Sequence, residues 1–215
     1  MHETSRRFRP RPARGGFTLI ELLAVIVIIG LLIVFLVPLL SRQQENAKVL
    51  ATRSFLQTLS TAVSEYENEK GDYPGSSWKE EWGSAPNNTN LGAEALVIAL
   101  YGSKWQSRLS EDQLCNTDND ESKKALARFA KPSLFEIKDQ WGNPIAYSHR
   151  RDYEHAQVYA MVDSTGQPVG ESTFKARMNP ETGQYWNPKG FQLVSAGPDG
   201  EFGTADDIPA WKESR

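Results

Sequence analysis

The sequence predicts an α+β fold in which a long N-terminal helix packs on a small antiparallel β-sheet. An almost continuous apolar run extends from Phe17 to Leu40. Apolar residues then recur at helical spacing as far as Lys70. From Phe135 onward, short apolar segments alternate with turn residues, as is typical of antiparallel strands.

The composition indicates one acidic domain attached to an apolar segment. The chain has 215 residues and 39% hydrophobic content, yet its mean hydropathy is only -0.52. The first sixteen residues carry five arginines and one glutamate, a formal charge of +4. The whole chain has a formal charge of −3, so residues 17–215 carry −7. An acidic body lacks the basic footprint of nucleic-acid binding, and we expect no nucleic-acid partner. The single cysteine, Cys115, excludes an intramolecular disulfide and a cysteine-based zinc cluster.

The apolar run is long enough to cross a membrane. Its 24 residues would span roughly 36 Å as a helix. The preceding arginines place the N-terminus in the cytoplasm and the body outside. A secretory signal peptide has a shorter apolar region and a small-residue cleavage site. Here the run ends in VPLLSRQQ, so we expect the segment to be retained as a single membrane span.

The stretch GGFTLIELL, residues 15–23, resembles the prepilin signature of type IV pilins and type II secretion pseudopilins. In that family a membrane peptidase cuts after the glycine and methylates the new N-terminus. The resemblance implies a cleaved basic leader over 1–16, a cut between Gly16 and Phe17, and an N-methylated Phe17. The span over 17–40 would then anchor the subunit as a single pass in the bacterial inner membrane and take part in its assembly, and the fold would be pilin-like.

Glu21 stands in the apolar run, where an ionised carboxylate costs on the order of a few kcal/mol. The resemblance matches it to the family's glutamate five residues into the mature chain, whose partner would be the free amine of Phe17 on a neighbouring subunit. Glu21 would then favour a docked, correctly registered subunit. The alternative is that it merely reaches the headgroups and stabilises the helix N-terminus through the helix dipole.

The helix is expected to continue through the polar segment 41–70, with a bend or loosened turn at Pro38. Gly71 and Pro74 would end it. An apolar stripe on this segment indicates core packing against the body, with a subunit interface as the alternative; it comprises Val49, Leu56, Leu59, Val63 and Tyr66.

The body, 71–215, should hold helices at Leu91–Gly102 and Glu121–Ala130, and strands within FEIKDQWGNPIAYSH, AQVYAMVDS and GFQLVSAGPDG. The segment DQWGNPIAY resembles a segment of the major type II pseudopilins, where Trp141 would anchor a turn against the helix. Residues from about 76 to 131 fall outside the resemblance and are interpreted as an insertion. Within it NTDNDE, residues 116–121, lacks the EF-hand glycine, so we expect a solvated acidic loop.

The stretch SAGPDGEFGTADDI, residues 195–208, combines three aspartates with three glycines that permit a tight reversal. Such a loop suits calcium, which prefers six to eight oxygen ligands, but it also suits a solvated turn. Resemblance to the calcium loop of major pseudopilins favours binding. It implies side-chain ligands Asp199, Thr204 and Asp206, a further candidate in Asp207, and backbone carbonyls near Ala196 and Glu201.

These features predict a structural subunit of a periplasmic pseudopilus that drives type II protein secretion, and not an enzyme. Its partners would be further copies of the chain, the prepilin peptidase, other pseudopilins, the inner-membrane secretion platform and the membrane itself. A type IV pilin or minor pilin for adhesion, motility or DNA uptake is the alternative, although such pilins usually carry a C-terminal disulfide. A membrane-anchored enzyme or solute-binding module is a third hypothesis, but the three histidines lack a metal spacing and no nucleophile or nucleotide motif occurs.

Overall fold

The computed structural model describes residues 17–102, 109–129 and 132–212. It divides into two compact units, Met1–Gln44 and Glu45–Arg215. The order of helix and short strands confirms the predicted α+β class.

The first helix, α1, spans Leu19–Lys70 and continues through Pro38 without a break. The bend or loosened turn expected at Pro38 therefore does not break the helix. At the other end Gly71 adopts a φ of +83°, and its amide donates to the Glu67 carbonyl at 2.7 Å. This is the expected glycine stop, because a left-handed conformation just past a helix end favours glycine.

The N-terminal part of α1 is apolar on all sides. In the described part of the chain, α1 is the one helix whose length and apolar character suit a membrane crossing. Large apolar side chains between Phe17 and Leu40 are exposed, with Phe17 at 85% and Leu32 at 62%. An exposed apolar surface of this kind needs lipid or neighbouring protein to cover it.

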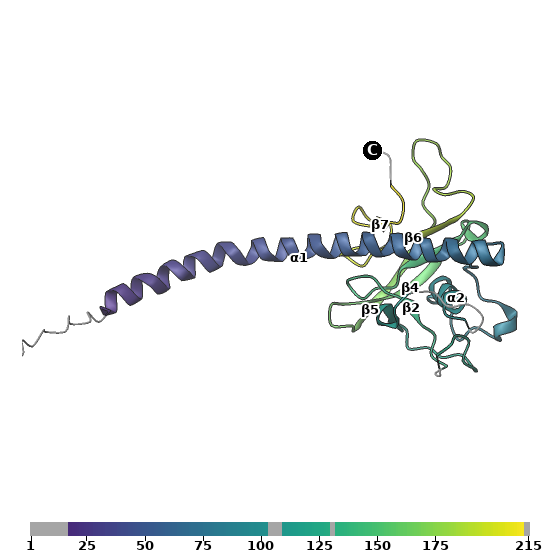
Figure 1. Ribbon diagram of the computed structural model, residues 1–215, viewed down its shortest axis with the longest axis horizontal. Helices are drawn as coiled ribbons and strands as arrows, with labels where there is room; N and C mark the ends of the chain where they lie inside the picture. Colours follow the sequence, from purple (N-terminus) through teal and green to yellow (C-terminus); the bar gives the residue numbers. More distant parts are fainter. Residues whose placement is uncertain (1–16, 103–108, 130–131, 213–215) are drawn as a thin grey trace, which may run out of the picture. The chain divides into compact units, whose positions relative to one another are not determined.

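The second unit contains the C-terminal part of α1 and a series of short elements (Figure 1). The helical elements are η1 (Glu80–Trp82), α2 (Leu91–Leu100), η2 (Glu111–Gln113) and η3 (Arg150–Asp152). The strands are β1 (Leu114–Cys115), β2 (Glu136–Ile137), β3 (Ala146–His149), β4 (Gln157–Val162), β5 (Pro168–Phe174), β6 (Phe191–Ser195) and β7 (Ile208–Pro209).

The strands form three small antiparallel sheets, whereas the sequence predicted one. Strand β1 pairs with β2, β4 pairs with β5, and β6 lies between β3 and β7. The prediction missed β5, because its glycine and proline argue against a strand and its side chains are mostly exposed. Strand β4 takes this hairpin partner and so does not join the β3–β6–β7 sheet.

The main core of the second unit lies between α1, α2 and the β3–β6–β7 sheet. The predicted stripe on α1 faces it: Leu56, Leu59 and Val63 are fully buried, and Val49 and Tyr66 pack at its edge. The fully buried partners from other elements are Leu96, Val97, Leu100, Tyr101, Ile137, Ile145, Tyr147, Leu193 and Ile208. Core packing of the stripe is thereby confirmed.

Helix α2 confirms the predicted helix at 91–102, but the second predicted helix is wrong. Residues 121–129 contain no helix, although their composition favours one. The Ser122 amide instead donates to the Pro132 carbonyl at 2.9 Å, and the Arg128 amide donates to the Tyr101 carbonyl at 2.8 Å. The Phe129 ring packs 5.4 Å from that of Tyr101. These tertiary contacts outweigh a helix propensity of a few tenths of a kcal/mol per residue.

Candidate functional site

The expected processing site lies at the edge of the described residues. Gly16 falls outside them, and Phe17 is exposed two residues before α1. The Thr18 amide and hydroxyl both donate to Glu21 Oε2, at 2.8 and 2.7 Å. In return, the Glu21 amide donates to the Thr18 hydroxyl at 3.3 Å. This reciprocal pattern is a capping box, which satisfies two amides that a helix start leaves without partners.

The capping box changes the interpretation of Glu21. Its carboxylate already has a partner within its own chain, which the sequence analysis did not foresee. The signal was present as Thr18-x-x-Glu21, the spacing of a capping box. Both hydrogen bonds from Thr18 end on Oε2, so Oε1 can still accept a hydrogen bond from a donor outside the chain.

The predicted calcium loop connects β6 to β7, which are antiparallel neighbours. Its polar groups converge on Asp206: the Thr204 hydroxyl donates to Oδ1 at 2.6 Å, and the Asp199 amide donates to Oδ2 at 3.1 Å. The same hydroxyl lies 3.1 Å from the carbonyl of Glu201, whose amide donates to Asp199 Oδ1 at 2.8 Å. Four of the predicted ligand residues are therefore brought together.

Gly197 allows the chain to close on itself. Its φ is +69°, and a Cβ at this position would lie 2.4 Å from the Asp206 carbonyl oxygen. Only glycine combines this conformation with this close approach. The preceding residue, Ala196, is fully buried at the base of the loop.

Asp207 has contacts different from those that converge on Asp206. Its Oδ2 accepts from the Gly203 amide at 2.9 Å and lies 3.9 Å from the Arg177 guanidinium. Its Oδ1 is buried without a hydrogen-bond partner among the described residues. Burial raises the pKa of Asp207 to about 6, because it penalises the charged form. This orphaned oxygen and the all-oxygen donor set fit a calcium ion.

The three aspartates of the loop do not form a cluster in which one oxygen of each lies within 4.8 Å of the others. In the described part of the chain, one group of acidic residues does: Glu94, Asp118 and Glu136. No local pattern in the sequence indicates this group, because its members come from α2, the NTDNDE segment and β2. The solvated loop predicted for NTDNDE is also wrong, since Asp120 is 9% exposed.

Trp141 occupies the position predicted for it. Its indole Nε1 donates to Glu45 Oε2 on α1 at 3.0 Å, and its ring packs at the edge of the core. The turn that presents it is held by Asp139, whose Oδ1 accepts from the Trp141 and Asn143 amides at 2.9 and 3.0 Å. The prediction that Trp141 anchors a turn against the helix is confirmed.

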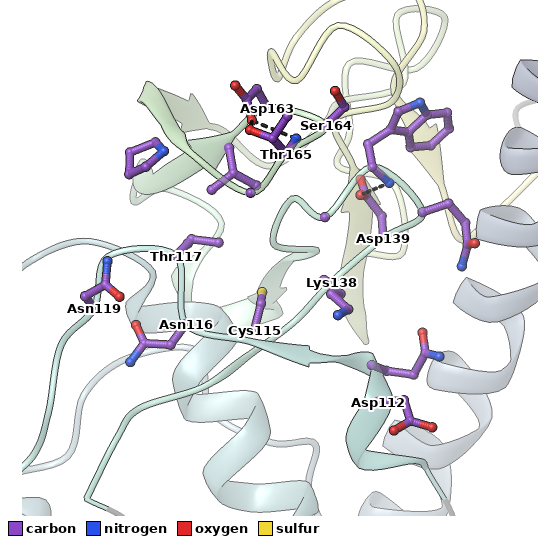
Figure 2. Close-up of a pocket in the computed structure, with 17 residues that line it drawn as sticks. Asp112, Cys115, Asn116, Thr117, Asn119, Lys138, Asp139, Asp163, Ser164 and Thr165 are labelled. Carbon is purple, nitrogen blue, oxygen red and sulfur yellow. Dashed lines mark hydrogen bonds between the residues drawn. The ribbon is translucent and has the colours of Figure 1, made fainter.

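A groove of about 610 Å³ lies beside this turn (Figure 2). Two of the aspartates that line it accept hydrogen bonds from backbone amides. Asp139 holds the Trp141 turn, and Asp163 Oδ1 accepts from the Thr165 amide at 2.8 Å and from its hydroxyl at 2.6 Å. These aspartates therefore fix turns and are not poised as an acid–base pair.

The prokaryotic N-terminal methylation motif matches residues 11–37. The chain is 29% identical to the type II secretion system core protein G of Escherichia coli over 208 residues, which is 96% of this chain and 97% of that protein. It is 28% identical to the core protein G of Pseudomonas aeruginosa over 137 residues, 64% of this chain and 75% of that protein. The type IV major pilin protein PilA of Myxococcus xanthus is 38% identical over 84 residues, 39% of this chain and 36% of that protein.

No solved structure matches the chain. The relatives belong to a secretion system and a pilus, and none is named as an enzyme. The chain carries the prokaryotic N-terminal methylation motif and is homologous, over most of its length, to core protein G of type II secretion systems.

Proposed function

We propose that the chain is the major structural subunit of a type II secretion pseudopilus. The observation that carries this proposal is the similarity to a core protein G across 96% of the chain, so that helix and body are both included. The exposed apolar surface from Phe17 to Leu40 supports it, because a filament core and a bilayer can both cover such a surface.

The N-terminal segment has two successive roles in this proposal. It first holds the precursor in the inner membrane, with the basic leader in the cytoplasm and the body in the periplasm. The prepilin peptidase then cuts between Gly16 and Phe17. In the filament, Glu21 uses Oε2 for its own helix cap and offers its remaining charge to the Phe17 amine of a neighbouring subunit.

The loop between β6 and β7 is proposed to bind calcium. Asp199, Thr204, Asp206 and Asp207 would supply side-chain oxygens, and carbonyls near Ala196 and Glu201 would complete the shell. The ion would neutralise the loop's carboxylates and fix the C-terminal segment of a chain that has no disulfide. The orphaned Asp207 Oδ1 supports this assignment.

Complementation tests the secretion function. The chain is expressed in a type II secretion host that lacks its own core protein G, and export of that host's substrate into the medium is measured. We expect export to be restored by the wild-type chain and not by a chain with a bulky residue in place of Gly16. Equal export with and without the wild-type chain, at matched membrane levels, would contradict the proposal.

A type IV pilin is the second candidate, because the Myxococcus xanthus pilin is the most identical of the three relatives over its aligned part. The same chain is therefore also expressed in a host that lacks its major pilin. Restored surface pili and surface motility without restored export would favour the pilin function. Restored export alone would favour the pseudopilus.

A further inference from the structure

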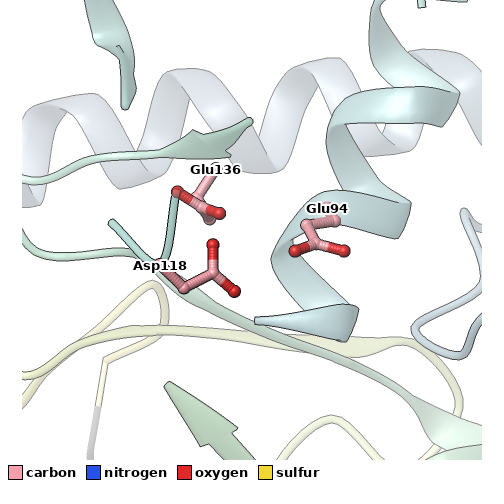
Figure 3. A group of neighbouring side chains, drawn as sticks. All are labelled: Glu94, Asp118 and Glu136. Atoms are coloured by element: carbon pink, nitrogen blue, oxygen red, sulfur yellow. The ribbon is translucent and has the colours of Figure 1, made fainter. Parts of the chain in front are cut away.

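A cluster of four carboxylates lies inside the second unit, away from the loop between β6 and β7. Glu94 is on the first turn of α2, Glu136 is on β2, and Asp118 and Asp120 come from the segment between β1 and β2. One oxygen each of Glu94, Asp118 and Glu136 lie within 4.8 Å of one another. Figure 3 shows these three carboxylates directed into one common space from separate segments.

Glu94 is the residue that the fold leaves unexplained. Its exposed fraction is 0%, and neither carboxylate oxygen accepts a hydrogen bond from an amide, hydroxyl or cationic group among the described residues. Its neighbour is the Asp120 carboxyl, with which it can form a hydrogen bond only when one of the two is protonated. One oxygen each of Asp118 and Asp120 is also buried without a partner. A buried carboxylate that lacks both a hydrogen bond and an opposite charge is strongly unfavourable, so buried charges are normally paired or bound to metal.

The remaining oxygens of the cluster are held in place by donors around it. The Asn87 side-chain amide bridges Asp118 Oδ2 and Asp120 Oδ2, at 2.8 and 3.1 Å. The Asn90 side chain and the Thr117 amide each donate to one oxygen of Glu136, both at 3.1 Å. These bonds orient the carboxylates and leave the orphaned oxygens for another partner.

No cationic side chain among residues 17–102, 109–129 and 132–212 forms an ion pair with these four carboxylates. Burial raises the pKa of Glu94 to about 10, and the neighbouring charge of Asp120 adds to the effect. Burial also raises the pKa of Asp120 to about 7 and that of Glu136 to about 8. The cluster therefore needs either shared protons or a positive ion.

We propose that Glu94, Asp118, Asp120 and Glu136 form a second divalent-cation site, and that the ion is calcium. All available donors are oxygens, which calcium prefers and which zinc seldom uses without nitrogen or sulfur. Calcium–oxygen distances of 2.3–2.6 Å place opposite ligands roughly 5 Å apart, close to the spread of this cluster. Magnesium keeps most of its waters and usually takes one or two carboxylates, whereas this buried cage offers more.

The site would give the predicted insertion a structural role. Asp118 and Asp120 lie within it and Glu94 is on its helix, whereas Glu136 lies outside on β2. An ion bound by all four would hold the insertion to the part of the chain that resembles other pseudopilins. This inference does not depend on the proposed secretion function.

Calcium stoichiometry of the full chain, purified in detergent, tests the proposal. Isothermal titration with calcium is compared between wild type and Glu94→Gln, with Glu65→Gln as a matched control because Glu65 is an exposed glutamate on α1. We expect Glu94→Gln to bind one calcium ion fewer per chain than wild type and Glu65→Gln to bind the same number. The same loss of one ion should occur in an Asp199→Ala background, where the loop between β6 and β7 is already disabled.

Circular dichroism checks that each variant is folded. Because a pKa of about 10 keeps Glu94 protonated in chelator at pH 7, Glu94→Gln should unfold close to the wild-type temperature there. It should lose part of the calcium-induced increase, because glutamine cannot supply the charge that the ion requires. If Glu94→Gln does not fold, Asp120→Asn serves as the second variant with the same expected loss. Unchanged stoichiometry in a folded variant would overturn the proposal and leave a proton-sharing cluster. No calcium bound by the Asp199→Ala chain would also overturn it.

Discussion

Thr18 and Glu21 cap the start of α1 reciprocally, so that each side chain accepts a hydrogen bond from the backbone amide of the other. Glu21 thus has a local role that needs no neighbouring subunit. A glutamine at this position would keep the cap but lose the charge, because capping boxes accept glutamate or glutamine. The local role and the proposed assembly role can therefore be separated by substitution.

Glu21→Gln should abolish filaments while leaving membrane insertion intact, because only the charge that pairs with the Phe17 amine is removed. Thr18→Ala should retain filaments, because it costs about 1 kcal/mol of helix stability but keeps the charge. Sheared filament fractions and membrane fractions are compared by immunoblot. Wild-type filament yield from Glu21→Gln would show that capping, and not charge pairing, is the role of this residue.

Processing gives a second prediction. Mass spectrometry of protein extracted from a host with an active prepilin peptidase should show a chain that begins at N-methylated Phe17. Gly16→Phe should remain full length, because a bulky side chain blocks approach to the scissile bond. Recovery of full-length wild-type chain alone would contradict the assignment of the cleavage site.

The loop between β6 and β7 gives a third prediction. Asp199→Ala should reduce the calcium-induced rise in melting temperature of the full chain, whereas Glu65→Gln should not. A site with a dissociation constant of roughly 0.1–1 mM contributes about 1 kcal/mol at millimolar calcium. Gly197→Ala should have the same effect, because its Cβ would collide with the Asp206 carbonyl. If Asp199→Ala and Gly197→Ala both showed the wild-type rise in melting temperature with calcium, the loop would be an ordinary turn.

The N-terminal helix could be predicted closely because its signals are local. The apolar run, the stripe ending at Tyr66 and the Gly71 stop each lie within a few turns of the residues that they organise. The turn after β6 could be predicted for the same reason, since its glycines and aspartates all lie within residues 197–207. Local patterns of this kind survive folding because few distant contacts compete with them.

The buried acidic cluster could not be predicted in the same way. Glu94 and Glu136 are 42 positions apart, and nothing in the sequence indicates that α2 brings them together. The helix predicted after Glu121 was wrong for the same reason, because amides of this segment donate to the distant carbonyls of Tyr101 and Pro132. Tertiary contacts determine the conformation of such segments, and these contacts leave no periodic pattern in the sequence.

The packing of α1 on the body gives a fourth prediction. Leu59 is fully buried in the main core, whereas Leu50 on the same helix is 64% exposed. Leu59→Ala should destabilise the second unit by about 2–5 kcal/mol, and Leu50→Ala should change it by less than about 0.5 kcal/mol. Denaturant unfolding monitored by tryptophan fluorescence measures both. Equal effects would mean that the stripe does not form the core.

The last prediction concerns His149, which is 2% exposed at the end of β3. Its Nδ1 accepts from the Arg151 amide at 3.1 Å, and its Nε2 lies 3.4 Å from Asp72 Oδ1. Burial lowers the pKa of His149 below its ordinary value, and the nearby charges of Arg151 and Arg150 add to this, although Asp72 opposes it. Protonation at Nδ1 would also remove the acceptor that caps η3.

A histidine whose pKa is lower in the folded state binds a proton more readily when the chain is unfolded. Its contribution to stability is therefore complete above about pH 6.5 and is lost as the pH falls from there toward the folded-state pKa. Asp72 does not titrate in this window, since its pKa is lowered from an already acidic value by hydrogen bonds from His149 and Tyr73 and by the charge of Arg151, which outweigh its burial. His149→Asn keeps a cap acceptor without a titrating ring. The melting temperature of the wild type should consequently fall relative to His149→Asn between pH 7 and pH 5 in chelator, and parallel curves for the two proteins would show that His149 does not titrate on unfolding.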